Sequence, residues 1–283
     1  MLRIAIQTKG RLNEDSLSLL SDAGIKIDEN KRKFLSIASN FPIEVLYLRD
    51  DDIPQTVAGG VADIGIVGLN EVRERGFDVN VLQKLGFGKC RLSLALPKDD
   101  NYTGLDFLEG KCIATSYPKI LRDYMDSKHI NCSIAQIAGS VEIAPAAGLA
   151  DAIFDIVSSG GTLVSNGLAE VEKVFFSEAV LIGNPDMDEE KKAIVDELIF
   201  RFESVIDSRG KKYILMNIPT EAIGEAVKIL PAMRSPTIMP LAQEGWCSLH
   251  SVVREDVIWD KIKALKAIGA EGILVLSLEK MIM

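Results

Sequence analysis

Asp155-Ile-Val-Ser-Ser-Gly-Gly-Thr162 is the stretch from which the organisation of this chain is inferred. The apolar residues after Asp155 predict the end of a buried strand, and the small turn that follows predicts a helix beginning near Gly161. Glycines let a backbone approach a ligand closely, and unpaired N–H groups at a helix start attract anions. Hydroxyl donors are added by Ser158, Ser159 and Thr162. The stretch suits a phosphorylated sugar, and an ordinary strand-to-helix turn with N-caps fits it equally well.

Composition narrows the class of protein. The chain has 283 residues, of which 47% are hydrophobic and 26% charged, as in an ordinary soluble globular protein of two or three domains. Its net charge of −9 argues against nucleic acid or an anionic membrane as the main partner. The first residues lack the apolar core of a signal peptide, and no stretch reaches the roughly 20 apolar residues that span a bilayer. We therefore expect a cytoplasmic protein.

Cysteine and histidine usage gives no sign of a metal centre built from these side chains. The four cysteines are far apart and form no CxxC pair, so free thiols in a reducing compartment are expected. The only two histidines, His129 and His250, are too few for a histidine-rich site and are interpreted as structural or surface residues. No metal-ligating residue is predicted.

Short β-branched runs alternate with helical patterns through the first two-thirds of the chain, which predicts parallel strands in an α/β domain. A helix is expected over Glu14–Ala23, and Leu94–Pro97 is interpreted as a crossing between two lobes, with Val174–Ile182 as the returning strand. The remaining strands are expected at Arg3–Gln7, Ile43–Leu48, Asp63–Val67, Arg91–Leu96, Cys112–Thr115, Ser133–Ile137 and Ala152–Val157.

The last part of the chain follows a different pattern. Apolar residues spaced three and four apart predict one long helix over Asp188–Arg209, which Gly210 is placed to end. The order after Gly210 is βαββαβ, typical of a ferredoxin-like fold. Its elements are expected at Tyr213–Ile218, Glu221–Leu230, Thr237–Leu241, Cys247–Val253, Asp256–Ile268 and Gly272–Ser277.

A longer pattern surrounds the opening stretch. A glutamate, a glycine six residues later, two aspartates and a Ser-Gly-x-Thr-Leu run resemble the signature of the ATP phosphoribosyltransferase family. The residues that carry this resemblance are Glu142, Gly148, Asp151, Asp155, Ser159, Gly160, Thr162 and Leu163. Further blocks that resemble the family are Ala5–Leu12, Arg49–Pro54, Val61–Gly68, Gly88–Ala95 and Arg234–Leu241, so the resemblance covers almost the whole chain.

The resemblance implies a fold and an activity. The fold is a two-lobed catalytic unit like the type II periplasmic binding proteins, with lobe I at 1–90 and 174–210 and lobe II at 91–173, followed by a regulatory domain at 211–283. The activity is magnesium-dependent transfer of phosphoribosyl from phosphoribosyl pyrophosphate to N1 of ATP, which opens L-histidine biosynthesis. The regulatory domain is that of the long form, implying a homo-oligomer between dimer and hexamer that L-histidine inhibits.

By the same resemblance, residues 155–162 hold the 5′-phosphate and ribose of the donor, and Lys9, Arg11 and Arg49 face phosphates. For two further candidates the residues leave alternatives open. Glu142 is either a ligand or a helix-cap carboxylate, and Tyr117 is either a ligand or a packed loop aromatic. Asp151 is expected to be structural, and the three acidic residues from Asp50 to start a helix rather than to hold a metal ion.

The histidine site is expected among polar residues at strand ends or turns of the last domain, namely Asn217, Ser235, Thr237 and Ser248. Family members often carry an acidic residue where this chain has Asn217, which bears on inhibitor affinity. Two other classes of protein would fit a pair of α/β lobes: a module that binds a small solute or effector, and a catalytically silent regulatory paralogue. The intact Ser-Gly-x-Thr run speaks against the second.

Overall fold

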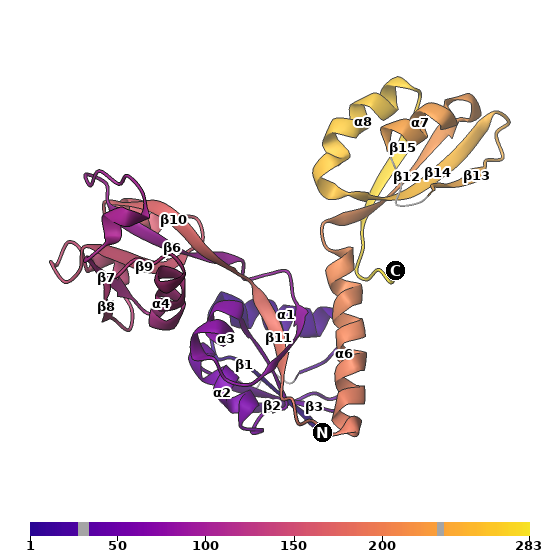
Figure 1. The fold of residues 1–283 in the computed structure, drawn as a ribbon. Helices are drawn as coiled ribbons and strands as arrows, with labels where there is room; N and C mark the ends of the chain where they lie inside the picture. The colour runs from indigo at the N-terminus through magenta and orange to yellow at the C-terminus, as the bar shows by residue number, and fades with distance from the viewer. Residues whose placement is uncertain (28–33, 231–234) are drawn as a thin grey trace. The chain divides into compact units, whose positions relative to one another are not determined.

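The computed structural model describes residues 1–27, 34–230 and 235–283. The chain divides into two compact units, Met1–Glu197 and Leu198–Met283. The first unit holds two separate sheets, and the second unit holds one (Figure 1). Arg234, the first residue of one family-like block, lies outside the described residues.

The first sheet has six strands in the order β2-β3-β1-β4-β11-β5. Its centre is parallel, because β1 pairs in parallel with β3 and with β4, while β11 is antiparallel to β4 and β5. The strands are β1 Leu2–Gln7, β2 Leu35–Ile37, β3 Ile43–Leu48, β4 Ile64–Gly68, β5 Asn80–Lys84 and β11 Ala179–Gly183. The helices between them are α1 Arg11–Asp22, α2 Ile53–Ala58 and α3 Leu69–Arg75. Both neighbours of β1 in this sheet follow it in the chain, so the carboxyl end of β1 is a topological switch point, where α/β folds bind ligands.

The second sheet has five strands in the order β10-β6-β9-β7-β8. Strand β7 pairs in parallel with β8 on one side and with β9 on the other, β6 is antiparallel to β9, and β10 is antiparallel to β6. The strands are β6 Cys90–Pro97, β7 Cys112–Thr115, β8 Ser133–Gln136, β9 Ala152–Val157 and β10 Leu168–Ser177. The carboxyl ends of β7, β8 and β9 therefore meet at one edge, and the segments that leave it carry Tyr117, Glu142 and the loop after Val157. Helices α4 Pro118–Ser127 and α5 Gly161–Ser165 begin at the same edge.

The connection between the two sheets differs from the sequence interpretation. Leu94–Pro97 is not a crossing point, because these residues lie inside β6 with Leu94 and Leu96 in the hydrophobic core. The chain crosses just before β6, where Gly88 adopts a left-handed φ of 62° beside Ala179. The predicted strand Val174–Ile182 is two strands, since β10 ends at Ser177 in one sheet and β11 begins at Ala179 in the other. A continuous apolar run predicts that residues on both sides of the crossing are buried, but it does not show that they belong to different sheets.

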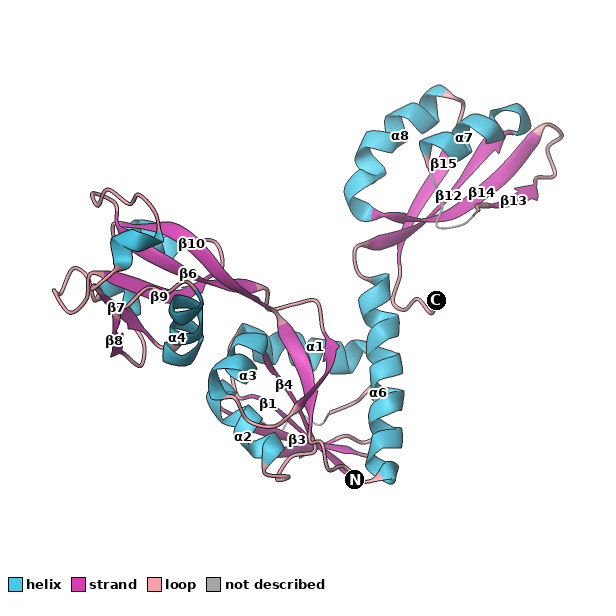
Figure 2. Ribbon diagram, in the orientation of Figure 1, coloured by secondary structure: helices cyan, strands magenta, loops and turns pink. Residues whose placement is uncertain are grey.

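The second unit confirms the ferredoxin-like order. Its sheet is β13-β14-β12-β15, and α7 and α8 cover one face (Figure 2). The elements are β12 Lys211–Pro219, α7 Ile223–Ile229, β13 Thr237–Pro240, β14 Trp246–Arg254, α8 Ile258–Ala267 and β15 Glu271–Ser277. Ile214, Met216 and Ile218 alternate along β12 and are buried toward the helices. The long helix α6, Glu189–Ser208, leads into this unit.

In the part of the chain that the structure describes, every helix is too short or too polar to pass through a bilayer.

Candidate active site

The loop after β9 has the conformation that its glycines predict. Strand β9 ends at Val157, and Gly160 adopts φ 85°, a left-handed conformation that side chains other than glycine rarely take. Helix α5 then starts at Gly161, as predicted, and it is only five residues long. A helix this short adds little macrodipole, so binding by this loop depends on its own N–H groups and hydroxyls.

The hydroxyls of the loop are available to a ligand. Ser158, Ser159 and Thr162 are exposed, and none of their hydroxyls has a hydrogen-bond partner among the described residues. The far side of the loop is fixed, because Ser165 Oγ donates to the Gly161 carbonyl at 2.7 Å. Asn166 Nδ2 likewise donates to the Thr162 carbonyl at 2.9 Å. The loop thus presents free donors on a backbone that α5 holds in place.

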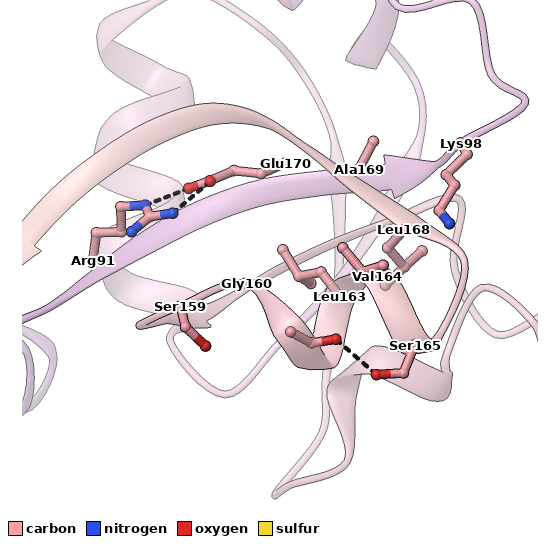
Figure 3. A pocket seen from close by; sticks show the side chains of 11 residues that line it. Arg91, Lys98, Ser159, Gly160, Leu163, Val164, Ser165, Leu168, Ala169 and Glu170 are labelled. Atoms are coloured by element: carbon pink, nitrogen blue, oxygen red, sulfur yellow. Dashed lines mark hydrogen bonds and ion pairs between the residues drawn. The ribbon is translucent and has the colours of Figure 1, made fainter.

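An open pocket of about 690 Å³ adjoins this loop (Figure 3). Loop residues from Ser159 onward form one wall together with α5, and β10 forms another. Arg91 and Lys98 bring positive charge to the pocket, although the guanidinium of Arg91 is turned toward the carboxylate of Glu170. Asp155, Glu142 and Thr162 do not line this pocket, so it lies beside the loop and apart from those two carboxylates.

Asp155 lies in β9, the strand that leads into the loop, and it is half-buried. Burial raises the pKa of its carboxyl above the ordinary value, and the negative charge of Glu142 raises it further. The hydrogen bond that Asp155 Oδ1 accepts from the Ile156 N–H, at 2.8 Å, acts in the opposite direction. Both carboxylates therefore belong to one electrostatic cluster at the edge of the second sheet.

The surroundings of Glu142 differ from the expectation. Glu142 sits in the 3₁₀ turn Val141–Ile143, and the helix expected after it does not form. Gly148, with φ 69°, ends the hydrogen-bonded turns there before a helix develops. The helix-cap alternative therefore has no helix to cap. By contrast Asp151 is structural, as expected, because its Oδ2 accepts from the Cys112 N–H at 2.7 Å.

The side chain of Tyr117 lies in a contact between the two lobes. Its side chain is buried, and its hydroxyl accepts from Asn70 Nδ2 at 3.2 Å and also bonds to the carboxylate of Glu71. Burial, and then the charge of Glu71, raises the pKa of the Tyr117 phenol far above its ordinary value. Of the two alternatives for this residue, the packed aromatic describes its position.

The three predicted cations gather at the carboxyl edge of the first sheet. Lys9 and Arg11 follow β1, and Arg49 follows β3. These strands pair in parallel with Gln7 opposite Leu48, and the Thr8 N–H donates to the Leu48 carbonyl at 2.8 Å. The cations therefore share the switch point of the sheet.

The three cations are also exposed. The side chain of Arg49 is 79% exposed and only 3.2 Å from the carboxylate of Asp51. Lys9 and Arg11 have no acidic partner within the described ranges. Asp50–Asp52 form the 3₁₀ turn that leads into α2, as predicted. Within the described residues, no three histidine, cysteine, aspartate or glutamate side chains are arranged to hold a metal ion.

Sequence reasoning missed Arg91 and Glu170. Arg91 Nε and Nη2 donate to the two carboxylate oxygens of Glu170 at 2.5 and 2.6 Å, and Arg91 Nη1 donates to the Ser158 carbonyl at 3.1 Å. The available signal was a charged residue at the start of an otherwise apolar strand, because such a charge needs a partner.

Three of the four predicted inhibitor residues share one sheet face of the second unit. Asn217 is opposite Ser248 in the β12–β14 register, and Thr237 is opposite His250 in the β13–β14 register. This face is the one turned away from α7 and α8, because the alternate residues of β12 are buried toward the helices. Ser235 is exposed and precedes β13. His250 bridges Ser248 Oγ at 2.9 Å and the Tyr213 hydroxyl at 2.8 Å, a role that the sequence did not indicate.

Comparisons with known proteins agree with this architecture. The family model described as ATP phosphoribosyltransferase matches residues 49–204, and the model described as the HisG C-terminal domain matches residues 208–280. The ATP phosphoribosyltransferase of Phocaeicola vulgatus is 63% identical over 283 residues, and that of Bacteroides thetaiotaomicron is 60% identical over 282 residues. Each alignment covers 100% of both chains.

Among solved structures, the ATP phosphoribosyltransferase (HisG:HisZ) complex from Thermotoga maritima matches with TM-score 0.64 and 31% identity, over 73% of this chain and 98% of that one. The substrate-binding protein of an amino acid ABC transporter matches with TM-score 0.50 and 12% identity, over 73% of this chain and 93% of that one. The second likeness concerns the fold alone.

The first unit is therefore a two-lobed α/β transferase unit of the type II periplasmic-binding-protein kind. Together with the additional ferredoxin-like unit, these matches show that the chain belongs to the ATP phosphoribosyltransferase family, in its long form. Its reaction joins the phosphoribosyl group to ATP in histidine biosynthesis.

Proposed function

We propose that the two sheet edges divide the substrates between them. The loop from Ser158 to Thr162 holds the 5′-phosphate of phosphoribosyl pyrophosphate, and Lys9, Arg11 and Arg49 hold the pyrophosphate or the triphosphate of ATP. The observation that carries this proposal is the contrast between free hydroxyls on a fixed loop and exposed cations at a switch point. The loop offers hydrogen-bond donors to the 5′-phosphate, and the cations offer positive charge to the pyrophosphate or the triphosphate.

The chemistry requires positioning more than a strong base. N1 of ATP is already a nucleophile, and it attacks C1 of the ribose as the bond to pyrophosphate breaks. Positive charge then develops on the ribose ring and negative charge on the leaving group. Asp155 is placed to stabilise the ribose side when ionised, and the lysine and arginine residues stabilise the leaving group. Because the pKa of Asp155 is raised, the acid limb of the rate profile lies above that of an ordinary aspartate.

The site fits a magnesium ion that arrives on the pyrophosphate. Magnesium in such sites is held by one or two carboxylates and by substrate phosphates, so Asp155 and Glu142, whose charges interact, would be the carboxylates available to it. The bound ion would neutralise charge on the leaving group. The work of the chain itself is to orient the ribose through Asp155 and to receive the phosphates.

The second unit is the proposed site of feedback inhibition by L-histidine, in a homo-oligomer of up to six chains. Support comes from the convergence of Asn217, Thr237 and Ser248 on one sheet face. An amide at position 217 can accept a hydrogen bond from the ammonium group of histidine but supplies no opposite charge. Inhibition by this chain is therefore expected to be weaker than in a variant with a carboxylate there.

The test is an absorbance assay for phosphoribosyl-ATP, with ATP, phosphoribosyl pyrophosphate, Mg²⁺ and added pyrophosphatase, run with and without millimolar L-histidine. Product that histidine suppresses, more strongly in Asn217→Asp than in the wild-type chain, supports both parts of the proposal. Product insensitive to histidine in both chains refutes the inhibitor site. Absence of product with or without Mg²⁺ from folded protein refutes the proposed transfer and favours a binding or regulatory role.

A further inference from the structure

Arg91 is placed between a strand pair and the phosphate loop. It lies on β6 opposite Val157, the last residue of β9, so its side chain starts beside the first loop residue. Its Nη1 donates to the Ser158 carbonyl at 3.1 Å. This contact makes Arg91 a side chain that fixes the beginning of the loop, just as α5 fixes its end.

Glu170 on β10 holds Arg91 in that position. The carboxylate accepts from Nε and Nη2 at 2.5 and 2.6 Å (Figure 3). It also accepts from Ser93 Oγ at 2.7 Å. This fork-to-fork geometry fixes the plane of the guanidinium and aims Nη1 at the loop. The two side chains are only 22% and 20% exposed, so solvent screens the pair less than a surface ion pair.

The electrostatics of the pair fit the same role. Arg91 lowers the pKa of the Glu170 carboxyl, and the hydrogen bonds to Glu170 raise the pKa of Arg91. Both shifts favour the charged forms of the two side chains. The charge of Arg91 is paired with that of Glu170, and the remaining contact of the guanidinium is the hydrogen bond to the loop.

We propose that Arg91, oriented by Glu170, is a positioning residue that holds the Ser158–Thr162 loop in the geometry that receives the 5′-phosphate. The proposal rests on the assignment of this loop to the donor phosphate made above. Arg91 acts through the Ser158 carbonyl and does not touch the substrate. Because β6 and β10 are also the strands that lead into and out of the second sheet, the loop is tied to the segments that join the lobes.

If Arg91 contacted the substrate directly, Glu170→Gln would change the KM for phosphoribosyl pyrophosphate in the opposite direction from that expected for a positioning role. If the guanidinium contacted the phosphate, Glu170 would compete with the substrate, and Glu170→Gln would lower the KM for phosphoribosyl pyrophosphate. If Arg91 acts through the loop, Glu170→Gln loosens the guanidinium and raises that KM. The sign of the change in KM separates the two.

The experiment measures KM for both substrates, kcat and melting temperature in the full-length enzyme with Mg²⁺. Arg91→Lys keeps the charge but cannot make three directed contacts, so the KM for phosphoribosyl pyrophosphate is expected to rise roughly tenfold, with the KM for ATP within about twofold. Glu170→Gln is expected to raise the same KM by a smaller factor. Arg122→Lys is the matched control, because Arg122 Nη1 also donates to a carbonyl, that of Cys132 at 3.2 Å, on an exposed part of lobe II.

Thr162→Val separates failure of this proposal from failure of the loop assignment. A normal KM in Thr162→Val refutes the loop assignment and the positioning role with it. A raised KM in Thr162→Val beside a normal KM in Arg91→Lys refutes the positioning role alone. A lower KM in Glu170→Gln, or a lower melting temperature in both pair variants with no change in KM, also overturns it.

Discussion

The carboxyl edges of the two sheets in the first unit both offer groups that can bind phosphate, but the groups differ. The edge of the first sheet carries long exposed cations, with Arg49 79% exposed. The edge of the second sheet carries a short loop fixed at both ends, with free hydroxyls and the half-buried Asp155. Exposed cations act over a distance and are screened by salt, whereas a fixed loop acts through short hydrogen bonds that depend on geometry. The difference indicates that the first edge attracts phosphate groups electrostatically, whereas the second edge positions a phosphate by hydrogen bonds.

Asp155→Asn is expected to have the largest effect. Removing the charge that faces the ribose should lower kcat/KM roughly 10²- to 10³-fold. The same change should raise the melting temperature at neutral pH, because a carboxyl with a raised folded-state pKa costs stability when ionised.

The sign of the pH dependence follows from the direction of that shift. The folded wild-type protein binds the Asp155 proton more tightly than the unfolded chain does. The contribution of Asp155 to stability is therefore full below its unfolded pKa and is lost as pH rises through its folded pKa. Melting curves from acidic to neutral pH should show a gap between variant and wild type that widens with pH. A variant less stable than wild type at neutral pH would contradict the assignment.

Lys9→Gln and Arg11→Gln should each lower kcat/KM by about 10- to 100-fold, the loss typical of one hydrogen bond to a charged group. The more informative result is the salt dependence. Loss of an exposed cation should flatten the plot of log kcat/KM against ionic strength, while Thr162→Val should leave its slope unchanged. Equal slopes in all the variants would remove the distinction between the two edges.

Glu142→Gln tests the coupling within the second edge and should reduce kcat/KM by less than about tenfold. Because the charge of Glu142 raises the pKa of Asp155, its removal should move the acid limb of the pH profile to lower pH. The measurement is kcat/KM from pH 4 to pH 8, with sampling of about half a unit to resolve a limb near the aspartate range. An unmoved limb would show that another group controls it.

Glu74→Ala should have the smallest effect on activity, because this residue acts at the contact between the lobes rather than at either edge. Glu74 on α3 accepts from the N–H groups of Lys119 and Ile120, both at 2.9 Å, and so caps α4, whose own N-cap residue has no side-chain cap. Its loss should cost about 1 kcal/mol in urea unfolding. Asp123→Asn, which breaks only exposed ion pairs, is the control and should change stability by less than about 0.5 kcal/mol.

Local patterns predicted the elements well where one element stays in one environment. Strands β3, β7 and β9 have the predicted bounds, and α6 is one residue shorter at each end. The error lies where the environment changes along an apolar run, as at the Ser177–Ala179 break. Tyr117, for which the sequence left two alternatives open, is buried in the structure. A sequence gives the hydrophobicity of a residue but not which neighbour covers it.

The sequence by itself determined the family, the α/β class of the first unit, the ferredoxin-like order of the second and the loop that begins at Ser158. The family follows from the resemblance of the residues around Asp155 to a known signature, and the rest follow from periodicity and glycine positions, which are local properties of the chain. Only the tertiary structure decided that Arg91 and Glu170 meet beside that loop, although they are 79 residues apart in the chain, and that Tyr117 faces α3. The physical reason is that hydrogen bonds between distant strands depend on sheet order and register, and many pairings are compatible with the same local pattern.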